Sequence, residues 1–231
     1  MLGFIRCLNF MKPNEKENIF TDEVDYANTA DASVWGTEDL ATTNLINKTE
    51  IHGKWLNLCA GDGRFNNKFL EKADEVVAVD IDESALQKLV RITPDFLKNK
   101  LSIKTMNVTE RFLLKNADFD GVFSVGTMHL FPKAVFKNIV SEIDRILKPG
   151  GRIIIDFATD IKRTYSDGSL WIVENEPNYS TEEALVFLEE VFQNYKTNFT
   201  VETVEPELVK LKEKEYVFTS NFVLVTAIKQ N

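Results

Sequence analysis

Short apolar runs alternate with helical patterns through the middle of the chain, and this alternation is the strongest constraint on its fold. Val and Ile dominate several of the runs, as expected for strands that are buried on both faces. The predicted strands span residues 54–58, 75–80, 101–107, 120–125 and 152–157. The intervening predicted helices span residues 64–73, 82–92 and 132–151. This order predicts an α/β fold with a doubly wound, mostly parallel sheet.

The last third of the chain departs from this alternation. We expect residues 160–180 to form a long irregular insert. A helix is then predicted, with its cap at Ser180 or Thr181. The segment 199–229 is rich in strand-forming residues, with a turn expected at 219–221. No helix separates the two final runs, so we expect them to pair antiparallel at the edge of the sheet.

Residues 12–50 are polar, with scattered apolar anchors, and residues 1–50 are expected to form a helical cover or lid ahead of the main domain, residues 51–231. A helix is expected to start at Thr37. We interpret Tyr26 and Trp35 as packing residues, with closure over a bound ligand as the alternative. Residues 1–13 are expected to be a loosely held terminus and not a signal peptide, because Arg6 interrupts their apolar patches and no small-residue cleavage site follows.

Composition excludes several classes of protein. The formal net charge is −9 and the pI is near 4.9, a balance that disfavours a nucleic-acid partner. No apolar run approaches the roughly 20 residues that span a bilayer, so no membrane partner is expected. The two cysteines, Cys7 and Cys59, form neither a disulfide framework nor a metal-binding pattern. A cytoplasmic location without a bound metal is therefore the expectation.

The stretch WLNLCAGDGRF places Gly61 and Gly63 around a single aspartate, directly after a predicted strand. Either the turn itself requires glycine, or a ligand lies against the loop where Cβ atoms would intrude. Asp80 ends the next strand about 20 residues beyond the turn, where a carboxylate can accept hydrogen bonds from ribose hydroxyls. A dinucleotide fold would require a third glycine at Asn66, which disfavours NAD. No lysine followed by serine or threonine completes a Walker loop.

Together with VVAVDID, FDGVFSVGTMHLFPK and EIDRILKPGGRIIID, this stretch resembles the class I, Rossmann-like S-adenosylmethionine-dependent methyltransferases, in particular their small-molecule branch. The resemblance extends over about residues 50–160. It implies binding of S-adenosyl-L-methionine and release of S-adenosyl-L-homocysteine. It also implies a set of cofactor-binding residues from the carboxyl ends of four strands: Asn57, Cys59, Ala60, Gly61, Asp62, Gly63, Asp80, Ile81, Asn107, Val108, Ser124, Val125 and Gly126.

Two positions depart from the family pattern. Asn57 replaces the usual acid of the first motif, and Cys59 replaces its first glycine. Asn57 supplies no charge, and a left-handed backbone at Cys59 would be strained. His129 follows the fourth strand of the pattern, where it is the candidate catalytic residue, as a general base or a substrate contact, with packing as the alternative.

The resemblance implies methyl transfer to an oxygen, nitrogen or carbon nucleophile. Neither the Asn/Asp-Pro-Pro-Tyr motif for a nucleobase amine nor a Pro-Cys nucleophile is present, so a small-molecule acceptor is favoured. RNA and protein acceptors stay open as alternatives. Two other classes are kept: a cofactor-binding protein without turnover and, disfavoured by Asn66, an NAD(P) oxidoreductase.

Overall fold

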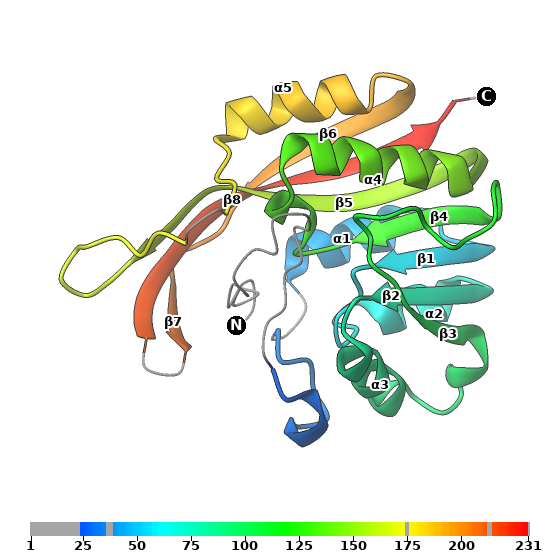
Figure 1. Cartoon of the computed structure of the whole chain (residues 1–231), viewed down its shortest axis with the longest axis horizontal. Coiled ribbons are helices and arrows are strands. Elements are labelled where there is room, and N and C mark those ends of the chain that lie inside the picture. The colour runs from blue at the N-terminus through cyan, green and yellow to red at the C-terminus, as the bar shows by residue number, and fades with distance from the viewer. Residues whose placement is uncertain (1–23, 36–38, 174–175, 212–213, 231) are drawn as a thin grey trace.

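The computed structural model describes residues 24–35, 39–173, 176–211 and 214–230. The expectations for residues 1–13 and for Thr37 lie outside these residues. In the described chain, eight strands form a single mixed sheet (Figure 1). The strands are β1 (Lys54–Leu58), β2 (Glu75–Asp80), β3 (Leu101–Thr105), β4 (Phe119–Ser124), β5 (Leu147–Thr164), β6 (Tyr195–Thr203), β7 (Glu207–Leu211) and β8 (Lys214–Lys229).

The sheet has the order β3-β2-β1-β4-β5-β8-β6, and β7 pairs with β8 outside this path. Strands β1 to β5 run parallel, whereas β8 is antiparallel to β5, to β6 and to β7. The α/β fold with an antiparallel C-terminal strand is therefore confirmed. The edge position itself is taken by β6, and β8 lies one strand inside it.

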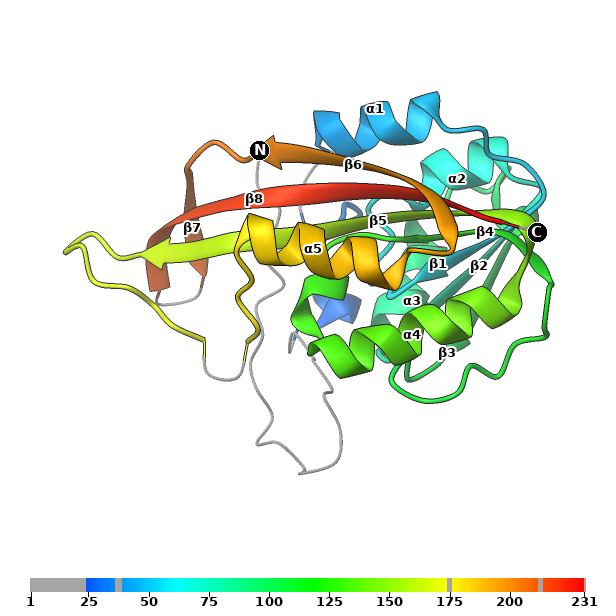
Figure 2. The same ribbon diagram turned by 90° about the horizontal axis from the view of Figure 1, so that it is seen from above.

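Helices cover both faces of the sheet, with α1 and α2 on one side and α4 and α5 on the other (Figure 2). The α-helices are α1 (Leu40–Lys48), α2 (Asn66–Lys72), α3 (Glu83–Ile92), α4 (Lys133–Ile146) and α5 (Thr181–Val191). Three short 3-10 helices join them: η1 (Tyr26–Asn28), η2 (Lys98–Lys100) and η3 (Met128–Leu130).

Alternate residues of the central strands enter two separate cores. Leu56, Val122 and Ile153 pack on the side of α4 and α5. Trp55 and Phe123 belong to the cluster beneath α1 and α2. Burial on both faces explains why these strands read as continuous apolar runs.

Helices α1 and α5 each begin directly after a residue whose side chain caps the first turn. Asp39 caps α1, because its carboxylate accepts a hydrogen bond from Thr42 N at 2.7 Å. Ser180 caps α5 in a reciprocal pair with Glu183, so the first of the two predicted caps is confirmed.

The turn predicted at 219–221 is wrong, because β8 continues through these residues without a break. Asn221 pairs with Thr159 of β5 and with Thr203 of β6, so it lies inside the sheet. The irregular insert also begins later than predicted, because β5 continues to Thr164.

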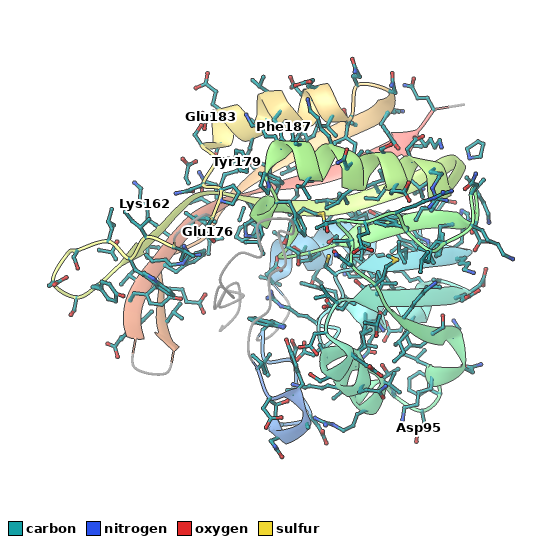
Figure 3. The ribbon with its side chains drawn as sticks, in the orientation of Figure 1. Asp95, Lys162, Glu176, Tyr179, Glu183 and Phe187 are labelled. Atoms are coloured by element: carbon teal, nitrogen blue, oxygen red, sulfur yellow. The ribbon has the colours of Figure 1, made fainter. Side chains whose placement is uncertain are left out.

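Beyond the core, β5, β7 and β8 extend as an antiparallel arm. The arm begins at a bulge in β5, where Asp160 has a φ of +51° and its carboxylate accepts from Thr181 N at 3.0 Å. Within the arm, the buried Arg163 guanidinium makes two hydrogen bonds to the carboxylate of Glu176, at 2.6 and 2.8 Å. Figure 3 labels Glu176 where the returning chain lies against the strands.

Close packing between β1 and β4 leads to the first prediction. A Cβ on Gly121 would lie 2.4 Å from the ring of Trp55, which is 1% exposed. The Trp55 indole is fixed by a hydrogen bond to His52 O at 2.9 Å. We expect Gly121→Ala to lower the free energy of unfolding by about 1–3 kcal/mol, measured by urea denaturation.

The double variant Trp55→Phe/Gly121→Ala separates this collision from a general effect of alanine. The smaller ring should make the alanine less costly than it is beside Trp55, giving a measurable coupling energy. Equal alanine penalties in both backgrounds would contradict the packing account.

Candidate active site

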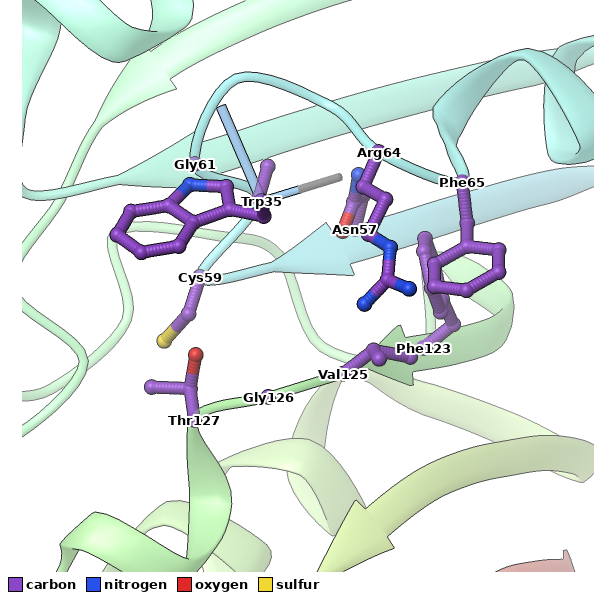
Figure 4. A pocket seen from close by; sticks show the side chains of 11 residues that line it. Trp35, Asn57, Cys59, Gly61, Arg64, Phe65, Phe123, Val125, Gly126 and Thr127 are labelled. Carbon is purple, nitrogen blue, oxygen red and sulfur yellow. The ribbon is translucent and has the colours of Figure 1, made fainter. Parts of the chain in front are cut away.

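A pocket that is partly open to solvent lies at the carboxyl ends of β1 and β4 (Figure 4). In open α/β sheets, ligands bind beyond the carboxyl ends of the strands. The lining residues come from the strap (defined here as residues 24–35), from β1 and its following loop, and from β4 and its following loop: Trp35, Asn57, Cys59, Ala60, Gly61, Arg64, Phe65, Phe123, Val125, Gly126 and Thr127.

The loop after β1 has a left-handed backbone at three positions. The φ values are +58° at Cys59, +52° at Gly61 and +85° at Gly63. Cys59 therefore occupies the conformation that favours glycine. A Cβ on Gly63 would lie 2.6 Å from the Leu89 side chain, so this glycine is required by packing against α3. The turn explanation thus accounts for Gly63.

The carboxylate of Asp80 connects this loop to the end of β2. Its oxygens accept hydrogen bonds from Gly61 N at 2.8 Å and from Asp82 N at 3.0 Å. Asp80 is 3% exposed. The loop and the carboxyl end of β2 are consequently held together at the site where the sequence predicts a ribose.

Asp62 is outside the cavity lining, and its carboxylate joins three segments of the chain. Its carboxylate lies 3.0 Å from Lys88 Nζ of α3, and both side chains are fully buried. The same carboxylate accepts from Ser33 Oγ at 2.7 Å and from Val34 N at 2.8 Å. These contacts fix the strap on the loop, and Trp35 follows directly as part of the cavity wall.

Arg64 is the charged residue of the cavity wall and extends beside Asn57 (Figure 4). Its guanidinium lies 5.0 Å from the centre of the Phe65 ring and 3.9 Å from Asp39 Oδ2. Asn57 donates to Asn66 Oδ1 at 3.1 Å, so its amide links β1 to α2.

A buried carboxyl group lies directly behind the cavity. Asp156 of β5 is 1% exposed, and its Oδ1 accepts from Gly126 N at 2.6 Å. Burial raises the pKa of Asp156 to about 7, and the nearby Asp39 adds to this effect. The Gly126 hydrogen bond and the Arg64 guanidinium oppose the rise in pKa.

The structure brings about half of the predicted site residues to the cavity. Those lining it are Asn57, Cys59, Ala60, Gly61, Val125 and Gly126. Those outside its lining are Asp62, Gly63, Asp80, Ile81, Asn107, Val108, Ser124 and His129.

Sequence reasoning missed Arg64, Phe65, Phe123 and Thr127 as lining residues. For Trp35 it favoured packing over the alternative of closure over a ligand, and Trp35 lines the cavity. Arg64 and Phe65 directly follow the glycine motif, which was a usable signal. The fully buried Tyr26 is a packing residue, as predicted.

His129 lies on η3 and is 6% exposed. Its ring packs edge-on against Phe157, with the ring centroids 6.4 Å apart. His52, in contrast, is exposed, with 66% of its side chain accessible.

The residues that the structure describes contain no group of three or more His, Cys, Asp or Glu side chains able to hold a metal ion. None of the helices described is both long enough and apolar enough to cross a membrane.

Known proteins that are similar to this chain include methyltransferases. Residues 56–151 match a family model described as a methyltransferase domain. Phosphoethanolamine N-methyltransferase 1 of Triticum aestivum is 32% identical over 101 residues, which is 43% of this chain. The match spans only 20% of the wheat protein.

Solved structures share the fold at low sequence identity. The YcgJ protein of Bacillus subtilis has a TM-score of 0.62 and 12% identity, with coverage of 82% of this chain and 97% of YcgJ. Phosphoethanolamine N-methyltransferase 2 of Haemonchus contortus, in complex with phosphomonomethylethanolamine and S-adenosylhomocysteine, has a TM-score of 0.57 and 13% identity. That alignment covers 83% of this chain and 52% of the nematode protein.

The sheet order, the glycine loop with Asp80, and the matched segment lead to one assignment. Residues 56–151 are similar to a methyltransferase domain, and the described chain has a Rossmann-like methyltransferase fold.

Proposed function

We propose that this protein transfers a methyl group from S-adenosyl-L-methionine to an oxygen, nitrogen or carbon nucleophile of a small molecule, releasing S-adenosyl-L-homocysteine. The observation that carries the proposal is the cavity at the carboxyl ends of β1 and β4, formed by the loop that bears the family motif. The wheat and nematode relatives, named for N-methylation of phosphoethanolamine, support a small acceptor.

The residues present fit this cofactor. A Cβ on Gly126 would have nothing within 4 Å, so the floor of the cavity leaves space for a ligand. Cys59 and Gly61, whose backbone conformation is left-handed, line the same space. We assign ribose binding to Asp80, and adenine contacts to Ile81, Asn107 and Val108. Ser124, Val125 and Gly126 would support the methionine end.

When bound, S-adenosylmethionine supplies a methyl group on a sulfonium, which is already activated for displacement by a nucleophile. The protein then needs mainly to bring the nucleophile into line and to exclude water, and orientation provides most of the acceleration. Phe65, Phe123 and Val125 give the cavity an apolar wall suited to this task.

The direct test is transfer of a labelled methyl group to a panel of small amines and alcohols, with phosphoethanolamine included. Methylation of at least one small acceptor is expected. Cofactor binding with no transfer to any small molecule, RNA or protein would indicate a binding protein without turnover. Binding of NADH in place of S-adenosylhomocysteine would favour the oxidoreductase alternative.

The ribose assignment predicts a loss of affinity in Asp80→Asn. This variant keeps an oxygen that can accept from Gly61 N but removes the charge. Charge-assisted hydrogen bonds contribute about 1.5–3 kcal/mol each, so affinity for S-adenosylhomocysteine should fall about tenfold or more by calorimetry. An analogue without the ribose hydroxyls should bind both proteins within about twofold. If the variant retains the parent's preference for the intact ribose, Asp80 has another role.

We also propose that the N-terminal part of the chain covers the site. Trp35 of the strap lines the cavity, and Asp39 at the start of α1 lies 3.9 Å from Arg64 in the cavity wall. Arg91 of α3 adds to the attachment, because its guanidinium donates to the carbonyl oxygens of Tyr26 and Thr29 at 3.3 and 3.2 Å.

Removing the positive charge of the buried ion pair tests this cover. Lys88→Met leaves Asp62 buried without its ammonium, which should lower the free energy of unfolding by about 3–5 kcal/mol. Hydrogen exchange should accelerate in the strap more than in the sheet. The double variant Lys88→Met/Asp62→Asn should recover part of the lost stability, because no charge is left uncompensated. Unchanged exchange in the strap of Lys88→Met would contradict the proposed attachment.

His129 stays our candidate for a role on the acceptor side, because η3 follows the carboxyl end of β4. We expect His129→Ala to keep its affinity for S-adenosylhomocysteine and to lose methyl transfer, by about 10²–10⁴-fold if it is a general base. The exposed His52→Ala serves as the matched control and should retain full activity. Full activity in His129→Ala would limit this residue to packing against Phe157.

A further inference from the structure

Strand β6 forms one rim of the sheet. It is the last strand in the sheet order, and β8 is its neighbour on the inner side. Figure 2 shows β6 at this rim, between α1 on one side and α5 on the other. Helix α5 packs on β5 and β8, the two strands inside β6. From Lys196 to Thr203 every side chain is exposed except Phe199, which is half-buried. Within the described chain, the outer edge of β6 is therefore open.

The backbone groups of alternate β6 residues point away from β8. Just beyond the strand, Val204 N donates to Ser220 O of β8 at 3.0 Å, so residue 204 faces inward. Hydrogen-bonding direction alternates along an antiparallel strand, so the even-numbered residues of β6 bond to β8 and the odd-numbered residues face outward. The outward set includes the N–H and C=O groups of Thr197, Phe199 and Val201.

An open edge of this kind is a template for pairing with another strand. Proteins usually protect such edges by shortening the strand, adding a bulge or proline, or placing charged residues along it. The opposite edge of the sheet, β3, has five residues, whereas β6 has nine. The register between β6 and β8 is continuous from Tyr195 to Thr203, and β6 contains no proline and a single lysine. Strand β6 thus lacks most of the usual protection.

The sequence of β6 is complementary to itself in the antiparallel direction. Phe199 is its middle residue, with Lys196 three positions before it and Glu202 three positions after it. Two β6 strands that pair about Phe199 place each Lys196 opposite the partner's Glu202. Opposite charges that face each other across strands stabilise the pairing, and like charges destabilise it. Both charged side chains are exposed and lie on the same face of the strand.

The backbone geometry agrees with this register. It places Phe199 opposite the partner's Phe199 and Thr197 opposite the partner's Val201, so outward-facing groups meet in hydrogen-bonded pairs. Moving the centre by one residue in either direction keeps outward groups opposite each other but loses the charge match. Lys196 then faces the partner's Thr200 or the partner's Val204. Only the register centred on Phe199 satisfies both the backbone and the charges.

We propose that β6 pairs with β6 of a second copy of this chain, giving a two-fold symmetric dimer whose sheet is continuous across both copies. Val201 is 43% exposed and shares a face with Phe199, which packs against the core beneath α4 and α5. In the dimer, the partner's Thr197 covers Val201. One pair of strands buries less area than a permanent interface, so the dimer is reversible, with a dissociation constant in roughly the micromolar range. This inference does not depend on the proposed function.

Charge reversal tests the dimer in the full chain. Sedimentation velocity at about 1 to 300 µM should show the parent passing from monomer to dimer. Lys196→Glu and Glu202→Lys should each weaken the dimer about tenfold or more, because each sets like charges opposite each other twice. The chain has a net charge of −9, which the first variant makes more negative and the second less negative. A general charge effect would therefore act in opposite directions in the two variants.

Restoring the opposite charges should restore the dimer. The double variant Lys196→Glu/Glu202→Lys should dimerise within about threefold of the parent's affinity. An equimolar mixture of the two single variants should form heterodimers, because both cross-strand pairs again have opposite charges. Lys115→Glu and Glu71→Lys are matched controls at exposed positions outside β6, and both should keep the parent's affinity.

Thr197→Pro tests the backbone pairing separately. It removes one outward N–H and leaves the even-numbered residues bonded to β8, and a melting curve verifies that it folds. It should stay monomeric over the same concentrations. A parent that stays monomeric to about 300 µM would overturn the inference. A dimer that the β6 variants leave unchanged would place the interface on another surface and would also overturn it. Loss in both single charge variants with recovery in the double variant supports the pairing.

Discussion

The buried ion pair between Asp62 and Lys88 is the contact on which the site depends. Neither side chain reaches solvent, so each charge requires the other. Asp62 also binds Ser33 and Val34 of the strap. One carboxylate thus joins the motif loop, α3 and the strap, and it fixes the segment that brings Trp35 to the cavity.

This arrangement explains how the loop tolerates an altered glycine pattern. Cys59 adopts a left-handed φ of +58°, which costs roughly 1–2 kcal/mol in a residue with a Cβ. The surrounding contacts hold the loop in this shape: Asp62 anchors one side, and Asp80 accepts from Gly61 N on the other. Gly63 has no such freedom to change, because a Cβ would collide with Leu89.

Much of the fold was predictable because its signals are local. The bounds predicted for β1 and β2 match the structure, since each run is apolar and ends at a polar turn. The polar residues at 219–221 resembled a turn, yet the Asn221 amide donates to Asp160 and Thr181 from distant segments. Such long-range partners leave no mark on the adjacent sequence. The glycine loop was likewise visible, whereas the strap reaches the cavity only through tertiary contacts.

The central claim is that the loop after β1, the end of β2 and the turn after β4 together hold the cofactor. Hydrogen exchange followed by mass spectrometry, with and without S-adenosylhomocysteine, tests this claim most directly. The account predicts slower exchange at residues 57–65, 80–82 and 124–127, together with the strap. Binding that leaves these segments unchanged and protects another surface would contradict the account.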